Sequence, residues 1–235
     1  LRAVRNGEEL QRARFYCRTK KGKTRIDVTQ APYFAKGDGE TVNTEALQRA
    51  IDDCAPDQAV YFPEGVYMTG SLNLHSDMEL YLDKGAVLKG TAEPDDYLPR
   101  RWSRFEGTEM ECLSGLLNLG EVDHTAGPTS RNVVIRGGGT IEGGGRLLAE
   151  RVIEAERERL KDYLAELGSR IEEYENADTI PGRVRPRLLH ICNAENISIH
   201  NVTLKNGASW NVHMIYSQDI VTYGCHFRSR NIWNG

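Results

Sequence analysis

An all-β solenoid, the parallel β-helix, is the fold that this sequence predicts, and a repeat near residue 200 is the first observation behind it. Residues 196–204 are echoed by residues 219–227, 23 positions later. Each copy reads apolar-x-apolar, two spacers and apolar-x-apolar again, with Thr222 as the one weak match. Such alternation makes short strands with one buried face, and a fixed period of this size is typical of stacked coils.

A series of short apolar runs between residues 59 and 90 is the second observation. Short bends separate the runs, and because no Asn-Gly or Asp-Gly lies between them, hairpins are disfavoured. The apolar residues that mark these strands are Val60 and Phe62, Val66 and Met68, Leu72 and Leu74, Met78, Leu80 and Leu82, and Val87 or Leu88.

The pattern stops at residues 91–130, which show no period and predict a long loop. Strands restart at residues 132–135 and 140–141, and coils resume near Leu188. The glycines at 137–139 and 143–145 fit neither a phosphate-binding loop nor a dinucleotide-binding fold, so we interpret them as tight bends between strands.

Two helical segments interrupt the strands. Asn43 is a suitable N-cap for a helix over residues 44–54, whose apolar face is expected to cap the open end of the stack. A second stripe over about 146–177 predicts an inserted helix or helical pair on the outside of the stack, with a weak point at Gly168 and a dimer contact as the alternative. We therefore expect an N-terminal extension or linker at 1–26 and a single β-helix domain at 27–235.

Composition narrows the function classes. Hydrophobic residues make up 39% and charged residues 27% of the 235 positions, as in soluble globular proteins, and no apolar run is long enough to span a membrane. The net charge of −4 gives no overall attraction to nucleic acid. The cysteines are odd in number, scattered and without a CxxC pair, which predicts reduced thiols and no metal site: Cys17, Cys54, Cys112, Cys192 and Cys225. Reduced thiols favour a cytoplasmic location, with a secreted or periplasmic one as the alternative.

Several polar motifs invite a functional interpretation. The pairs Asp52-Asp53 and Asp95-Asp96 are expected to be a solvated helix face and a turn, not catalytic acids. The asparagines of the sequons at 196–198 and 201–203 are expected to bond near bends or to stack as a ladder. In Trp210-Asn211-Val212-His213, an aromatic, an amide and an imidazole could face a sugar, and a purely structural role for His213 is equally open.

Blocks spread along the chain carry a family resemblance. Residues 37–51 resemble the first loop and cap helix of the polygalacturonase-type glycoside hydrolases, which are pectin-degrading, right-handed β-helix enzymes. Further blocks match in order, and the last is the most specific: 62–72, 104–109, 138–143, 185–187 and 204–213. Residues 104–109 resemble a loop of exo-acting bacterial members, and the helical insertion resembles one in a bacterial subgroup. The chain thus resembles the N-terminal portion of a bacterial exo-polygalacturonase.

The resemblance implies hydrolysis of α-1,4-galacturonosyl bonds with inversion and without a cofactor. The family uses an Asp that follows an Asn-x pair, an Asp-Asp pair one coil later, then a Gly-His-Gly and an Arg-x-Lys that grips the substrate carboxylate. Only Asn234-Gly235 matches this series. We therefore assign no catalytic residue, and we expect the catalytic coils beyond Gly235 and no activity from these 235 residues alone.

Binding is what the resemblance assigns to the residues present. The expected substrate contacts are Trp210, Asn211, His213, Trp233 and Asn234. The expected partner is an oligogalacturonide or pectin, with neither nucleic acid nor membrane, and a homo-oligomer could form through the helical insertion. The alternatives are a non-catalytic polysaccharide-binding β-helix and a pectate lyase, and the lyase would need calcium-binding Asp clusters that the sequence does not show.

Overall fold

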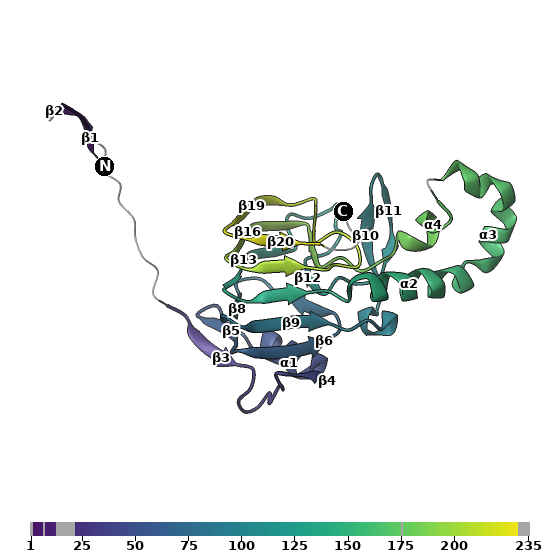
Figure 1. Ribbon diagram of the computed structural model, residues 1–235, viewed down its shortest axis with the longest axis horizontal. Coiled ribbons are helices and arrows are strands. Elements are labelled where there is room, and N and C mark those ends of the chain that lie inside the picture. The colour runs from purple at the N-terminus through teal and green to yellow at the C-terminus, as the bar shows by residue number, and fades with distance from the viewer. Residues whose placement is uncertain (1, 7, 13–21, 175, 230–235) are drawn as a thin grey trace.

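Three parallel sheets stacked in coils form the body of the protein. The computed structural model describes residues 2–6, 8–12, 22–174 and 176–229 (Figure 1). Sheet 1 is β3 (Thr24–Asp27), β5 (Gln58–Phe62), β8 (Glu79–Leu82), β13 (Ser130–Gly137), β16 (Ala194–His200) and β19 (Gln218–Tyr223). Sheet 2 is β4 (Asp38–Val42), β6 (Gly65–Thr69), β9 (Ala86–Gly90), β14 (Thr140–Glu142), β17 (Thr203–Lys205) and β20 (His226–Arg228). Sheet 3 is β7 (Leu72–Leu74), β12 (Leu117–Leu119), β15 (Leu189–Cys192) and β18 (Val212–Ile215). The predicted parallel β-helix is confirmed.

From β5 to β18 each coil visits the sheets in the order 1, 2, 3, and the repeat seen in the sequence is the offset between neighbouring coils. Ile197 pairs with Ile220 and Leu204 pairs with Phe227. Both large insertions leave the stack at the same corner, between a strand of sheet 2 and the next strand of sheet 3. Separately, β1 (Arg2–Arg5) and β2 (Glu8–Arg12) form an antiparallel pair.

Columns of apolar side chains fill the inside of the coils. Val60, Leu80, Ile135 and Ile199 lie in register on successive strands of sheet 1, and all are buried. In β6 the buried positions are Tyr67 and Thr69, whereas Val66 and Met68, which marked this strand in the sequence, alternate to the other face. Apolar residues on both faces made the phase of β6 ambiguous, and the Tyr67 hydroxyl can enter the core because it donates to the carbonyl of Pro63.

Helix α1 (Thr44–Asp52) closes the N-terminal end of the stack, as predicted, and buries Leu47, Ala50 and Ile51 (Figure 1). Asn43 precedes it, but its side chain does not cap the helix. The Asn43 amide instead accepts from the Lys36 N–H and donates to the carbonyl oxygens of Lys36 and Thr41, so it fixes the preceding loop.

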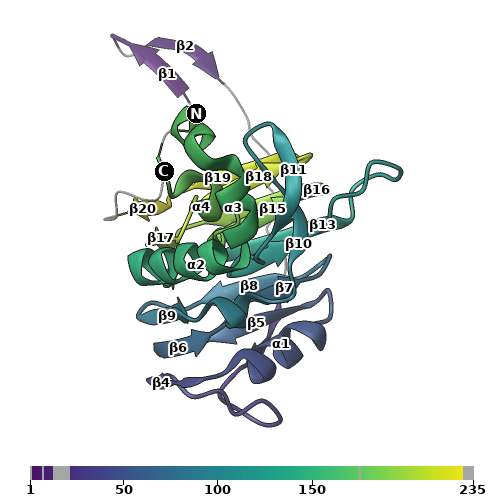
Figure 2. The same cartoon turned by 90° about the vertical axis from the view of Figure 1, so that its right-hand side faces the viewer.

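The helical insertion is also confirmed. It consists of α2 (Gly145–Arg159), α3 (Lys161–Leu167), a 3₁₀ turn η2 (Gly168–Glu173) and α4 (Thr179–Gly182), which lie outside the strands (Figure 2). The helix breaks at Gly168, which has a φ of 51°. On α2, Glu156 is buried between the guanidinium groups of Arg100 and Arg159, which ties the insertion to the segment before β10.

The prediction of a long loop over 91–130 is wrong. A 3₁₀ turn η1 (Pro94–Tyr97) is followed by an antiparallel hairpin of β10 (Arg101–Phe105) and β11 (Thr108–Cys112), and then by β12. The turn is Glu106-Gly107, with Glu106 at a φ of 51°. Polar and charged residues such as Arg104 and Glu109 face each other across the hairpin, so no apolar alternation announced it.

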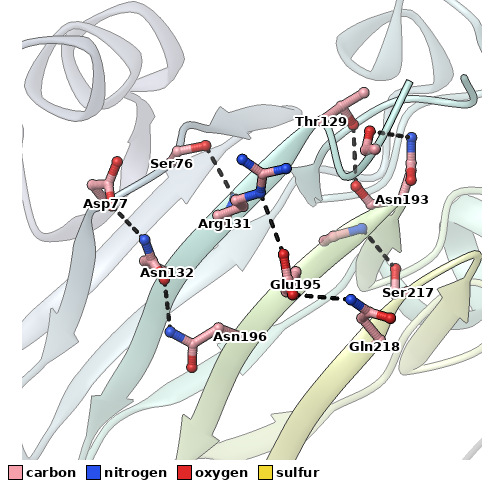
Figure 3. Close-up of polar contacts among 12 residues, drawn as sticks. Ser76, Asp77, Thr129, Arg131, Asn132, Asn193, Glu195, Asn196, Ser217 and Gln218 are labelled. Carbon is pink, nitrogen blue, oxygen red and sulfur yellow. Dashed lines mark hydrogen bonds and ion pairs between the residues drawn. The ribbon is translucent and has the colours of Figure 1, made fainter.

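A polar ladder marks one corner of the coils (Figure 3). Asp77, Asn132, Asn196 and Asp219 all adopt left-handed backbone conformations, with φ between 54° and 65°. Asn196 Nδ2 donates to Asn132 Oδ1, and Asn132 Nδ2 donates to Asp77 Oδ1, each at 2.7 Å. Beside them, Glu195 accepts from Gln218 and pairs with Arg131. The predicted asparagine ladder is thus confirmed at the first sequon.

Replacing Asn132 by alanine is expected to lower the free energy of unfolding by about 2 kcal/mol, because a left-handed backbone disfavours a Cβ and two exposed hydrogen bonds are lost. Asn132→Gly keeps the backbone freedom and is expected to cost about half as much. Urea unfolding measures both. A glycine variant that is no more stable than the alanine variant would mean that the backbone conformation does not select Asn here.

Candidate functional site

The outer face of sheet 3 carries a row of polar side chains. Asn73, Asn118, His190 and His213 lie in register on β7, β12, β15 and β18. Residues on either side of this row, such as Leu189 and Ile191, face the core and are buried. Two of the predicted contacts, Trp210 and His213, therefore meet at one end of this face.

A column of stacked rings joins the hairpin to this end of sheet 3. Measured between ring centroids, Phe105 lies 5.3 Å from Trp210, Trp210 lies 4.9 Å from His213, and His213 lies 5.4 Å from His190. The Arg187 guanidinium sits over the same Trp210 ring at 5.3 Å. Neighbours already contact the Trp210 ring surface, so this half-buried side chain braces the face while its remaining exposed part is open to a ligand.

Both histidines of the column are held neutral. Burial lowers the pKa of His213 to about 4, and the charges of Arg187 and Arg104 lower it further. Burial likewise lowers the pKa of His190 to about 3, helped by His213 and Arg101. A neutral imidazole can exchange hydrogen bonds with sugar hydroxyls but adds no charge. The His213 Nδ1 atom is buried without a hydrogen-bond partner among the described residues.

Guanidinium groups supply the charge of the face. Arg187 is 1% exposed and donates to the carbonyl oxygens of Arg185 and Arg104, at 2.8 and 3.2 Å. Burial lowers the pKa of Arg187. Among the described residues, no carboxylate forms an ion pair with Arg187. Since carbonyl oxygens do not cancel a full charge, the region around Trp210 stays positive and favours an anionic ligand. Sequence reasoning noticed residues 185–187 as a family block but missed this role.

The other predicted contacts have different outcomes. Asn211 is 7% exposed, and its amide accepts from the Gly207 N–H and donates to the Ser229 hydroxyl, so its hydrogen bonds stabilise the local loop. Trp233 and Asn234 lie outside the described residues. A cavity of about 440 Å³ beside Trp210 is walled by Val212, Met214 and Phe227, and because Met214 and Phe227 are exposed, it is an apolar hollow at the surface.

The hairpin is fastened to the end of β18. Glu109 accepts hydrogen bonds from the Tyr216 hydroxyl and from His124 Nε2, and these bonds, with Tyr216 foremost, lower the pKa of Glu109. With Phe105 stacked on Trp210, the hairpin has two attachments to the face.

Neither Asp pair contributes to this face. Asp52 accepts from Gln48 and Asp53 from the Tyr33 hydroxyl on exposed parts of the α1 region, and Asp95 and Asp96 form η1, as predicted. Cys54, Cys112, Cys192 and Cys225 are free thiols, as predicted, and Cys17 lies outside the described residues. Within the described ranges, no three His, Cys, Asp or Glu side chains gather as a metal site would require.

Comparison with known proteins gives this geometry a context. Residues 31–93 match a family described as rhamnogalacturonase A/epimerase, pectate lyase-like. The chain is 30% identical to an exo-poly-alpha-D-galacturonosidase of Dickeya chrysanthemi, over 89% of this chain and 37% of that protein. It is 28% identical to a probable polygalacturonase of Vitis vinifera, over 80% of this chain and 34% of that protein. The chain therefore spans a little over a third of the length of these relatives.

Solved structures agree. The family 28 exopolygalacturonase of Yersinia enterocolitica superposes with a TM-score of 0.68 at 26% identity, covering 88% of this chain and 39% of that one. The exopolygalacturonase of Thermotoga maritima superposes with a TM-score of 0.65 at 23% identity, covering 92% and 50%, which supports the fold. These findings confirm the resemblance predicted from the sequence: the chain is similar to the polygalacturonases, right-handed parallel β-helix proteins, over most of its own length.

Proposed function

We propose that this chain is part of a glycoside hydrolase that cleaves α-1,4-galacturonosyl linkages of pectic oligosaccharides with inversion. The observation that carries the proposal is the positive, aromatic outer end of sheet 3, where Arg187 lies over Trp210 and next to His213. Such a surface suits a chain of sugars that each bear a carboxylate. The names of the relatives point to the same substrate class.

In this proposal the residues present bind and position the substrate. Inversion needs an acid and a base about 6.5–9.5 Å apart, with a water between them. The 235 residues match the family's acidic series only at Asn234-Gly235, so we propose that the catalytic carboxylates lie beyond Gly235 and that these residues alone do not hydrolyse pectin. Trp210, His213, Trp233 and Asn234 remain the proposed contacts, and Asn211, whose amide bonds to Gly207 and Ser229, is proposed to support the loop beside them.

Exo action is the finer part of the proposal. A hairpin that stacks through Phe105 on Trp210 and is fastened through Glu109 stands on the face along which a polysaccharide would extend. We propose that β10–β11 blocks that path, so that only a chain end can enter. A cytoplasmic location and pairing of two copies through α2 and α3 stay predictions. Among the described residues, no helix combines the length and the apolar character that crossing a membrane requires.

Trp210→Ala is expected to weaken binding of trigalacturonate by at least about tenfold, because it removes the ring that organises Phe105, His213 and Arg187. Trp102→Ala is the matched control, since Trp102 is 55% exposed on the hairpin and should leave affinity unchanged. Titration calorimetry measures affinity, and thermal unfolding shows that each variant is folded.

Activity is tested separately. The purified 235-residue chain should release no reducing ends from polygalacturonate, and release would contradict the assignment of the carboxylates beyond Gly235. Reading the encoded sequence past Gly235 should reveal an Asp followed by the rest of the family series. If the protein that includes the residues encoded past Gly235 binds polygalacturonate saturably but does not hydrolyse it, the non-catalytic polysaccharide-binding alternative is favoured.

A further inference from the structure

A second polar cavity lies on the same face of sheet 3, toward the N-terminal end of the stack. Its volume is about 810 Å³, and its walls include Asn73, Arg101, Glu121 and Ser130. It is formed by the turn after β7, the base of the hairpin and the loop before β13. Arg101 and Phe105 are the two ends of β10, about 13 Å apart along an extended strand, so the hairpin separates this cavity from Trp210.

Two groups in this cavity have unused hydrogen-bonding capacity. The Arg101 guanidinium contacts Asn73 Oδ1 at 3.2 Å and the Gly120 carbonyl at a long 3.5 Å, and its Nε is buried without a partner among the described residues. Ser130 is 2% exposed, and its hydroxyl likewise has no partner in the part of the chain that the structure describes. Leaving a buried polar group unpaired is costly, so each of these two groups calls for a partner such as a bound ligand.

The charges around the cavity are arranged for a ligand that has both a carboxylate and hydroxyl groups. Burial lowers the pKa of Arg101, yet an arginine stays charged, so the N–H groups of its two terminal nitrogens that Gly120 and Asn73 leave unused can bind a carboxylate. Glu121, which lies near Arg101, makes no side-chain hydrogen bond or ion pair with any described residue and is exposed, so it can accept from sugar hydroxyls. The Ser130 hydroxyl can donate or accept.

His75 contributes to the same wall. Its Nδ1 lies 2.7 Å from the Ser76 carbonyl oxygen and its Nε2 lies 2.8 Å from the Ile51 carbonyl oxygen. A carbonyl oxygen only accepts, so both ring nitrogens face backbone acceptors, and His75 shapes the wall of the cavity without offering a free group to a ligand.

We propose that this cavity is a second binding site for an acidic sugar, a hexuronate or the end of an oligouronide, separated by the hairpin from the end of sheet 3 that carries Trp210. The volume lies within the range of about 300–1,000 Å³ typical of small-molecule sites and accommodates a mono- or disaccharide. That the ligand is a uronate rests on the proposed function. That it carries a carboxylate and hydroxyl groups follows from Arg101, Glu121 and Ser130 themselves.

The test is titration calorimetry of the 235-residue chain with galacturonic acid and with galactose. Galacturonic acid should bind, and galactose, which lacks the carboxylate, should bind at least about tenfold more weakly. Arg101→Gln should reduce galacturonic acid affinity by about tenfold or more, whereas the matched control Arg146→Gln, on the exposed side of α2, should not change it.

Ser130→Ala is a second variant, needed because Arg101 also contacts Asn73 and Gly120. Loss of affinity in Arg101→Gln alone could therefore come from a disturbed local structure. The lost hydroxyl has no partner among the residues that the structure describes, so the melting temperature should not fall, while the affinity should drop several-fold. Equal affinity for galactose, or galacturonic acid binding that survives both Arg101→Gln and Ser130→Ala, would overturn the proposal. If Trp210→Ala alone abolishes the binding of galacturonic acid, the second binding site is also ruled out, while the proposed function stands. Binding sensitive to Arg101 and not to Trp210 would support this site even if the hydrolase proposal failed.

Discussion

Gly137→Ala is expected to lower the free energy of unfolding by about 4 kcal/mol or more, a large share of the stability of a single domain. Gly137 has a φ of 135°, which residues with a Cβ rarely adopt. An added Cβ would lie 1.8 Å from the carbonyl oxygen of Leu82, closer than any real contact. The same oxygen accepts from the N–H groups of Gly138 and Gly139, so it cannot move away without losing both bonds.

Gly107→Ala is the matched control for this substitution. A Cβ at Gly107, in the hairpin turn, would meet nothing within 4 Å, and this glycine is not among those with a positive φ. It should be neutral or stabilise by up to about 1 kcal/mol, since alanine restricts the unfolded chain. Thermal and urea unfolding compare the two. A Gly137→Ala protein as stable as Gly107→Ala would refute the tight packing of this corner.

Glu156→Gln is expected to cost about 3 kcal/mol, the second large effect. The carboxylate is 4% exposed and lies between Arg100 and Arg159, whose side chains are 23% and 54% exposed. Removing its charge leaves the Arg100 guanidinium partly buried with no counter-charge. Because Arg159 can turn to solvent, we expect the low end of the range for a broken buried pair.

Glu150→Gln, on the same helix, tests whether burial is the cause. Glu150 pairs with Arg146, and the two side chains are 47% and 62% exposed. Exposed pairs of this kind contribute about 0.3–0.5 kcal/mol, so this variant should be nearly neutral. Urea unfolding measures both variants. Similar losses for the two would mean that helix propensity, and not the buried carboxylate, decides the result.

The coil architecture was readable from the sequence because stacked coils repeat their constraints. Ile197 and Ile220 occupy equivalent positions and therefore keep similar residues, and Gly168 breaks an otherwise continuous helical stripe. Which face of each strand is buried was harder to predict, because a strand of five residues with Val66, Tyr67 and Met68 in a row has no unique buried face. The hairpin escaped prediction because it is stabilised by stacking of Phe105 on Trp210 and by the hydrogen bonds of Glu109, not by an apolar face of its own.

The site was less accessible than the fold. The block 210–213 pointed to the right end of sheet 3, yet only the structure shows that Asn211 uses its amide locally and that Phe105, more than a hundred residues earlier, completes the column. The cavity at Arg101 and Ser130 had no signal in the sequence. An unpaired buried donor is a property of what surrounds a residue, and the chain order does not reveal it.

The corner formed by Asp77, Asn132, Asn196 and Asp219 keeps the coils in the same register whatever the length of each coil. Hydrogen-bonded rungs are separated by 55 residues in one case and 64 in the next, while the adjacent rung between Glu195 and Gln218 spans only 23. The hairpin and the helices account for most of the difference, and both emerge at a corner remote from the ladder. Loop grafts at that exit should therefore leave coil register unchanged, which makes this corner a natural place to exchange the elements that shape specificity without redesigning the scaffold.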